Sequence, residues 1–161
     1  MKAISVHSSH SSCHAIILSL EGDAYLFGRN SNGCLGIPSA TLFVSENEPL
    51  KLQAKTLGGE KFTYAACGRN HSILVGNDGQ VWAAGANNYG QVRIFDAEWN
   101  RMLTPTDQCG HLPCPETVGF RPVTNTWGTE KIVKASAGLT FSLLLTESGK
   151  GVLRPRGINE R

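Results

Sequence analysis

Histidine and cysteine side chains gather in two short segments, and side chains of these types could hold a metal ion. They are His7, His10, Cys13 and His14 in "VHSSHSSCH" (6–14), and Cys109, His111 and Cys114 in "CGHLPC" (109–114). Zinc binds histidine nitrogens and cysteine thiolates, usually as two ligand pairs with short, regular spacing. Neither segment has a second pair with such spacing elsewhere in the sequence. Zinc stays an alternative for each segment, but the sequence predicts no metal and no cofactor.

A cysteine and a histidine could also act as a nucleophile and its base, because Cys67 lies four residues before His71. Such catalysis needs the two side chains to face each other beside an oxyanion hole. In a strand, the pleat sets the direction of each side chain and does not aim these two at each other. The "GRN" segments at 28–30 and 68–70 lack the Gly-x-x-x-x-Gly-Lys-Ser/Thr pattern of a phosphate loop. The sequence predicts no catalytic residue, no enzyme and no small-molecule substrate.

The composition excludes several classes of protein. The 161 residues are 40% hydrophobic and 17% charged, which fits one globular domain and not a disordered chain or coiled coil. A net charge of +2 is too small to indicate binding to nucleic acid or acidic membranes. The apolar segment "AIILSL" (15–20) is too short to span a membrane, and it is preceded by Ser and His and not by the Lys or Arg of a secretory signal. We expect an intracellular protein, nuclear or cytoplasmic, with free thiols at its five cysteines.

An internal repeat decides where these residues lie. "HAIILSLEGDAYLFGRNSNGCLG" (14–36) aligns without a gap with "HSILVGNDGQVWAAGANNYGQVR" (71–93) at an offset of 57. A third copy, "IVKASAGLTFSLLLTESGKG" (132–151), is displaced by 70 from the second. Spacings of this size are typical of propellers and other repeat arrays.

Two ring-bearing positions recur in the copies. His14, His71 and Phe141 share one position, and Tyr25 and Trp82 share another. Because phenylalanine fills the first position without a nitrogen, we interpret the histidines as residues that tie adjacent blades together, and not as bases or ligands. Tyr25 and Trp82 are interpreted as core or inter-blade packing.

Each copy predicts a set of short strands. "HSILVG" (71–76) and "VWAAG" (81–85) flank "NDGQ", which carries the Asp-Gly pair of a tight hairpin turn. "FTYAACG" (62–68) supplies a further strand that ends in glycine. Three or four short antiparallel strands with one apolar face describe a propeller blade. The carboxylates expected to be solvated at the turns are Glu21, Asp23, Asp78 and Glu147.

The pattern resembles the regulator of chromosome condensation repeat family. Residues 65–91 match its hallmark almost throughout, residues 14–36 match from the histidine onward, and residues 132–150 match the first half. "ACGRNHS" (66–72) is most similar to the second, chromosomal-passenger-type branch of the family. The resemblance implies a seven-bladed propeller that binds proteins through its loops without a cofactor. It also implies guanine-nucleotide exchange on small GTPases, or binding to them, as an alternative, and association with chromatin.

We therefore predict an all-β chain that forms a partial β-propeller of about two and a half repeats, as a single incomplete domain over 1–161. The copies are expected at about 1–57, 58–127 and 128–161, the last of them truncated. The third copy is expected to break after Gly149, because Arg154 and Pro155 do not easily continue a central strand. A full ring is longer than this chain, so we expect a fragment of a longer propeller, a truncated product or a mispredicted gene model.

The segment 92–130 departs most from the repeat. Part of it is expected to form the outer strand of a blade, although "DAEWNRML" (96–103) could be a short helix capped by Asp96. Loops on rigid scaffolds often carry function. The partner-binding candidates are Phe95, Trp99 and Arg101. The predicted function is a non-catalytic, protein-binding propeller scaffold; the alternatives are a small-GTPase exchange factor or regulator, and a propeller that plugs another enzyme.

Overall fold

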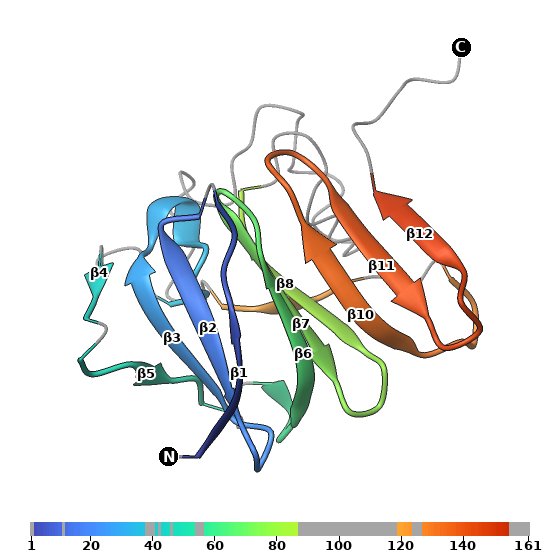
Figure 1. Ribbon diagram of the computed structural model, residues 1–161, viewed down its shortest axis with the longest axis horizontal. Helices are drawn as coiled ribbons and strands as arrows, with labels where there is room; N and C mark the ends of the chain where they lie inside the picture. The colour runs from blue at the N-terminus through green and yellow to red at the C-terminus, as the bar shows by residue number, and fades with distance from the viewer. Residues whose placement is uncertain are drawn as a thin grey trace.

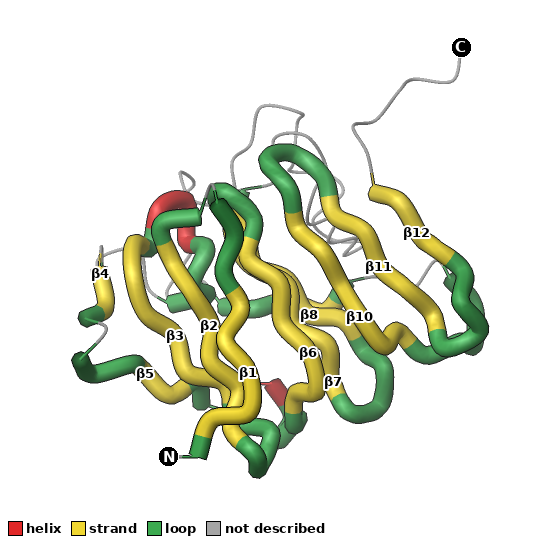
Figure 2. Tube along the Cα trace, in the orientation of Figure 1, coloured by secondary structure: helices red, strands yellow, loops and turns green. Residues whose placement is uncertain are grey.

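The computed structural model describes residues 2–10, 12–37, 41, 43–45, 47–53, 57–86, 119–123 and 127–154. Within these residues the strands form three antiparallel sheets that stand side by side, with a 3₁₀ turn, η1 (Ser31–Gly33), after the third strand (Figures 1 and 2). The prediction of an all-β chain is confirmed. We call the sheets the first, second and third blade, in chain order.

In each blade, strands that follow one another in the chain pair as a meander, except that the fifth strand of the first blade pairs with its third strand. The first blade contains β1 (Ala3–His7), β2 (His14–Ser19), β3 (Ala24–Arg29), β4 (Phe43–Val44) and β5 (Leu50–Lys51). The second contains β6 (Phe62–Cys67), β7 (His71–Gly76), β8 (Val81–Gly85) and β9 (Arg121–Pro122). The third contains β10 (Ile132–Ala137), β11 (Ser142–Thr146) and β12 (Gly151–Arg154). The inner strands β1, β6 and β10 lie next to one another (Figure 1).

The first strand of every blade carries the same irregularity. The register with the second strand shifts between Ala3 and Ser5 in the first blade, and the other two blades repeat the shift at matching places. The skipped residues Ile4, Thr63 and Val133 are all exposed. A β-bulge bends the strand and leaves one residue unpaired, so the bulge belongs to the repeat itself.

Glycine is required where the second and third strands meet. Gly85 pairs with His71 at a φ of +106°, and a Cβ atom there would collide with the Asn70 carbonyl and lie 2.7 Å from the His71 Cα. Gly28 pairs with His14 in the same way, at a φ of +99°. The repeated glycine therefore allows both the left-handed backbone and the close approach of two strands.

Two hydrophobic clusters lie between the blades. Leu74, Ala84 and the half-buried Trp82 of the second blade pack with Ile16 and Leu18 of the first. Ile73, Val75 and Val81 point to the opposite side and pack with Leu144 of the third blade. All six residues of β7 are buried. The expectation of one apolar face is therefore wrong for the second blade, because a neighbouring blade covers each of its faces.

The third copy does not break at Gly149. Residues 151–154 form β12, which pairs with β11 from Leu145↔Gly151 to Ser142↔Arg154. Among the described residues, no further strand pairs with β12. An arginine, or a following proline, is tolerated in such an edge strand although it would interrupt a central one.

Two details of the connections differ from the sequence pattern or extend it. His7 pairs with Ile16, whereas Ala66 pairs with Ile73. The first blade therefore has two more residues between its first two strands, and the offset of 57 applies only from His14 onward.

Residues 121–122 form β9, the outer strand of the second blade. This confirms that part of 92–130 supplies an outer strand.

Candidate functional site

The repeated histidines connect neighbouring blades. His14 Nε2 lies 2.7 Å from Ser72 Oγ in the second blade, and His71 Nε2 lies 3.0 Å from Ser142 Oγ in the third. His14 is 4% exposed and His71 is fully buried. A Cβ atom at Gly68 would collide with the His71 ring, so the glycine leaves room for it. The interpretation of these histidines as inter-blade ties is confirmed.

Burial makes both histidines poor bases at neutral pH. Desolvation lowers the pKa of His14 to about 4, and the nearby His71 lowers it further. Desolvation also lowers the pKa of His71 to about 4, against a raising effect of the Phe141 carbonyl. A base is most effective when its pKa lies near the working pH. The two rings therefore remain neutral and act in packing and hydrogen bonding.

The described cysteines and histidines do not assemble a reactive or metal-binding centre. Burial raises the pKa of Cys34 and of Cys67 to about 12, so neither is a thiolate at neutral pH. The Cys67 thiol donates to the His7 carbonyl at 3.2 Å and does not pair with His71. Among the described residues, no three histidine, cysteine, aspartate or glutamate side chains could share a metal ion. The "CGHLPC" segment lies outside the described residues.

One contact within the first copy was missed in the sequence. The Cys34 thiol lies 3.5 Å from Nδ1 of His14, opposite the nitrogen that meets Ser72. The buried amide of Asn30 holds the turn that carries Cys34, because it accepts from the Leu35 N–H and donates to the Thr41 carbonyl. In the sequence, only the alignment of Asn30 with Asn87 indicated that a side-chain amide holds this turn in place.

The two ends of the blades differ in charge. One end holds the β2–β3, β7–β8 and β11–β12 turns, and we call it the carboxylate end. Apart from Glu48 in the β4–β5 turn, all acidic residues of the described structure lie at this end, namely Glu21, Asp23, Glu60, Asp78, Glu130 and Glu147. Five lysines accompany them, namely Lys2, Lys51, Lys61, Lys131 and Lys150.

Carboxylates at this end fasten turns to strands and to other blades. Lys51 and Lys61 each approach Asp23 to 2.7 Å, and Lys61 comes from the second blade. These two ammonium groups lower the pKa of Asp23, whose side chain is only 13% exposed. The expectation of solvated turn carboxylates is therefore wrong for Asp23, because lysines far along the chain fold onto it.

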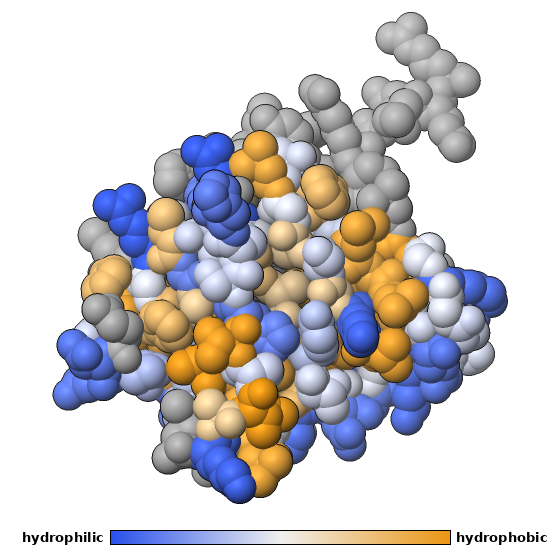
Figure 3. All heavy atoms as spheres, viewed as in Figure 1, coloured by the Kyte–Doolittle hydropathy of each residue, from blue (hydrophilic) through white to orange (hydrophobic). Residues whose placement is uncertain are grey.

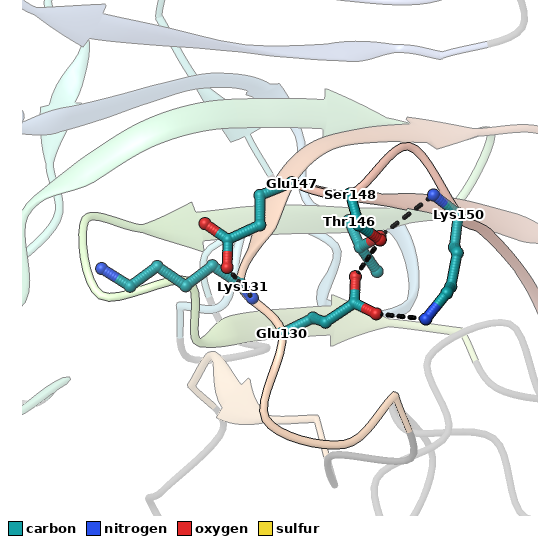
Figure 4. A network of polar contacts seen from close by, with 6 residues as sticks. All are labelled: Glu130, Lys131, Thr146, Glu147, Ser148 and Lys150. Carbon is teal, nitrogen blue, oxygen red and sulfur yellow. Dashed lines mark hydrogen bonds and ion pairs between the residues drawn. The ribbon is translucent and has the colours of Figure 1, made fainter.

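The third blade has a corresponding polar network, drawn in Figure 4. Glu130 accepts from the Lys150 ammonium at 2.5 Å and from the Ser148 hydroxyl. These donors, with Thr146, lower the pKa of Glu130 to about 2. The Lys131 N–H donates to Glu147 across the same turn. The network connects the β11–β12 turn to the segment before β10, so its charged groups already have structural partners.

The opposite end holds the β1–β2, β6–β7 and β10–β11 turns, and we call it the arginine end; it lies at the top of Figure 1. Arg29 at the end of β3 and Arg69 in the β6–β7 turn are exposed there, and Leu139 of the β10–β11 turn is 49% exposed. No acidic residue of the described turns accompanies them. Sequence reasoning missed this grouping, since three separate blades contribute to it.

The predicted partner-binding residues Phe95, Trp99 and Arg101 lie outside the described residues, as does the alternative helix 96–103. The described flanks of this segment are firmly held. The Ala86 N–H donates to the Asn70 carbonyl at the arginine end, 2.8 Å away. Phe120, 3% exposed, packs where a Cβ atom at Gly36 would lie. Residues 87–118 are thus inserted between two anchored points of the second blade.

Comparison with known proteins agrees with this architecture. Residues 21–75 match one model of the regulator of chromosome condensation (RCC1) repeat, and residues 62–91 match a second model of it. The chain belongs to the RCC1-repeat family. The human X-linked retinitis pigmentosa GTPase regulator is 31% identical over 147 residues, which are 91% of this chain and 12% of that protein. The Protein RCC2 homolog of Xenopus laevis is 29% identical over 145 residues, 90% of this chain and 24% of that protein.

Solved structures of the RCC1-repeat fold confirm the partial propeller. Prp20p from Saccharomyces cerevisiae superposes with a TM-score of 0.64 at 20% identity, over 97% of this chain and 33% of Prp20p. The chain therefore spans only a part of each of these relatives, a third of Prp20p and less of the other two. The assignment to the second branch of the family stays a prediction. No helix among the described residues is long and apolar enough to cross a membrane.

Proposed function

We propose that this RCC1-repeat chain is a non-catalytic scaffold that receives a protein partner at its arginine end. The observation that supports the proposal most is the separation of charge. Exposed Arg29, Arg69 and the apolar Leu139 lie at the same end of the three blades, and the Arg69 N–H donates to the Gly138 carbonyl next to Leu139. No described acidic residue lies in the turns of this end. Arginine is enriched in protein interfaces, and an exposed leucine beside it adds apolar area that a partner can bury. An acidic protein surface is the partner chemistry that this end fits.

The inserted segment is proposed as part of the same surface. It leaves the second blade at Ala86, beside the turn that carries Arg69. Phe95, Trp99 and Arg101 would add two aromatic side chains and one more arginine. A scaffold of this kind works in the nucleus or the cytoplasm and needs neither a cofactor nor a small-molecule substrate.

A second candidate function is regulation of a small GTPase, including nucleotide exchange. It is favoured by the name of one relative, a GTPase regulator, and by the description of Prp20p with its binding to Gsp1p and histones. Binding to histones, and so to chromatin, is a further partner proposal from the same relative. The buried His14, His71, Cys34 and Cys67 are held in packing, and exchange would act through loops that hold a GTPase and not through covalent chemistry.

Binding is tested with a panel of small GTPases and with histone octamers, each immobilised, against the 161-residue chain. Arg29→Glu/Arg69→Glu should abolish binding to a partner that wild type holds. Lys2→Glu/Lys131→Glu makes the same change in net charge at the carboxylate end and should leave binding unchanged. Equal losses for both variants would show nonspecific attraction and would overturn the arginine-end site.

Exchange is tested separately, by loading each GTPase with a fluorescent guanine nucleotide and following its release. Acceleration that disappears in Phe95→Ala/Trp99→Ala/Arg101→Ala would support the regulator. Binding without faster nucleotide release would support the scaffold function and contradict the exchange activity.

A further inference from the structure

The exposed large hydrophobic side chains of the described structure all lie in the outer blades. The first blade carries Ile4, Val6, Leu20, Phe43 and Leu50, and the third blade carries Val133, Leu139, Phe141 and Leu143. The second blade has none, since both of its faces are covered. Figure 3 shows this division as apolar surface over β1 and over β10 and β11, with paler surface between them. Exposed apolar patches of this kind commonly mark an interaction surface.

The repeat shows what kind of surface the third blade presents. Phe141, Leu143 and Leu145 occupy the positions of His71, Ile73 and Val75. The latter three face the third blade, because Ile73 and Val75 belong to the cluster between the second and third blades. Phe141, Leu143 and Leu145 therefore form a face made to pack against a following blade, and we call it the third-blade face. Phe141 is 40% exposed and Leu143 is 39% exposed.

The first blade presents the opposite half of such an interface. Val6, Ile17 and Tyr25 are cross-strand neighbours at the positions of Ala65, Leu74 and Trp82 in the strand register. Ala65, Leu74 and Trp82 pack with side chains of the preceding blade. Val6, Ile17 and Tyr25 therefore form a face made to receive a preceding blade, which we call the first-blade face. Val6 is 64% exposed.

These two faces also match in polarity. At both internal interfaces a histidine meets a serine of the next blade. At the third-blade face the histidine position holds Phe141, and in the first blade the serine position holds Ala15. A histidine or a serine left alone in a buried interface would lack a partner, whereas a phenylalanine and an alanine need none. Both faces have thus lost the polar group of the pair.

The turn glycine of the third blade adds a second match. Phe62 donates its N–H to the carbonyl of Gly22 at 2.8 Å, and Ile132 repeats this contact with Gly79 at 3.4 Å. An added Cβ atom at Gly79 would meet Lys131 of the next blade, whereas at Gly149 it would meet nothing within 4 Å. Ala3 of the first blade occupies the position of Phe62 and Ile132. Gly149 of one copy and Ala3 of a second copy can therefore form the backbone contact that Gly22 forms with Phe62 and Gly79 forms with Ile132.

We propose that the third-blade face of one copy of this chain binds the first-blade face of a second copy, head to tail. The contact continues the spacing of the internal interfaces, with Phe141 directed toward the position of Ala15. Lys134, which stands in the place of Tyr64, can extend its ammonium to the rim of the contact while its stem packs. Because each copy keeps one unused face, the association continues beyond two copies unless a ring closes.

The test uses two charge variants of the 161-residue chain and analytical ultracentrifugation over a wide range of concentration. Val6→Lys blocks the first-blade face, and Leu143→Lys blocks the third-blade face. Thr63→Lys places the same charge on an exposed position of the second blade and serves as the matched control. Circular dichroism and thermal melting check that the variants remain folded.

Head-to-tail binding predicts a pattern that no symmetric contact shares. Wild type and Thr63→Lys should reach the mass of two copies or more as the concentration rises, and stop only where a ring closes. Each blocked variant alone should remain a single copy, while their mixture should reach the mass of two copies and stop there. Dimers of Val6→Lys alone, or of Leu143→Lys alone, would show like faces in contact and overturn the proposal. A wild type that remains a single copy at every concentration would also overturn it.

Discussion

His71 Nε2 lies 3.0 Å from Ser142 Oγ across the second interface between blades, and this contact repeats the one between His14 and Ser72. The third copy places Phe141 at the ring position, over Gly138, as the His71 ring lies over Gly68. The repeat thus requires a flat ring at this place, and a nitrogen only where the next blade supplies a hydroxyl group. The energetic unit is the pair and not the single residue.

Ser142→Ala should lower the free energy of unfolding by about 1–3 kcal/mol, because it leaves a buried imidazole nitrogen without its hydroxyl partner. The double variant His71→Phe/Ser142→Ala should lose less than about 1 kcal/mol, since both polar groups are then absent. Urea unfolding of the two single variants and the double variant measures the coupling. Additive losses in this cycle would contradict the assignment of the two residues as a unit.

The same histidines should make the protein less stable in mild acid. Their pKa falls from about 6.5 in the unfolded chain to about 4 in the folded one, so the unfolded state takes up protons first. The stability they contribute is complete above pH 6.5, declines as the pH falls toward 4 and declines no further below it. At pH 5 the loss is about 2 kcal/mol for each histidine.

Urea unfolding between pH 7.5 and 5 measures this dependence above the range in which carboxylates such as Asp23 and Glu130 titrate. His71→Phe should remove its own share of the decline, about 2 kcal/mol at pH 5, and leave the shares of His14 and of the partly buried His7, whose pKa desolvation also lowers. An unchanged slope in His71→Phe would show that another group is responsible.

The repeat explains why the sequence predicts some contacts and not others. The histidine ties could be predicted because a position that recurs in three copies, once as phenylalanine, must serve a geometry common to all three. The strand β12 could not be predicted from residues 151–154, because the effect of an arginine or a proline depends on whether a strand lies at the edge. A single copy does not contain that information.

The charged groups were harder to predict for a related reason. Asp23 is only 13% exposed because Lys51 and Lys61 reach it from 28 and 38 residues away. Arg29, Arg69 and Leu139 lie at the same end of the blades although each belongs to a different blade. Local pattern places each residue on its strand or turn, whereas these groupings depend on how the blades stand beside one another.

Gly85→Ala and Gly149→Ala separate two requirements on glycine. Both positions have a positive φ, +106° and +85°, which costs an alanine about 1 kcal/mol. Only Gly85 also lies against backbone atoms, those of Asn70 and His71, while a Cβ atom at Gly149 would meet nothing within 4 Å. Gly149→Ala should therefore lose about 1 kcal/mol in urea unfolding, and Gly85→Ala about 3 kcal/mol or more. Equal losses would mean that the second and third strands do not approach as closely as described.

The cysteines should react in the order of their exposure. Cys13 is exposed, whereas Cys34 and Cys67 are buried and each has a pKa of about 12, so only about 1 in 10,000 of either is a thiolate at pH 8. In a Cys109→Ser/Cys114→Ser background, a thiol reagent should modify one group rapidly in the native protein and three after denaturation. Mass spectrometry should locate the rapid modification at Cys13. Rapid modification of Cys34 would show that its contact with His14 opens in the native state, and the first interface between blades would then be less firmly held than the second.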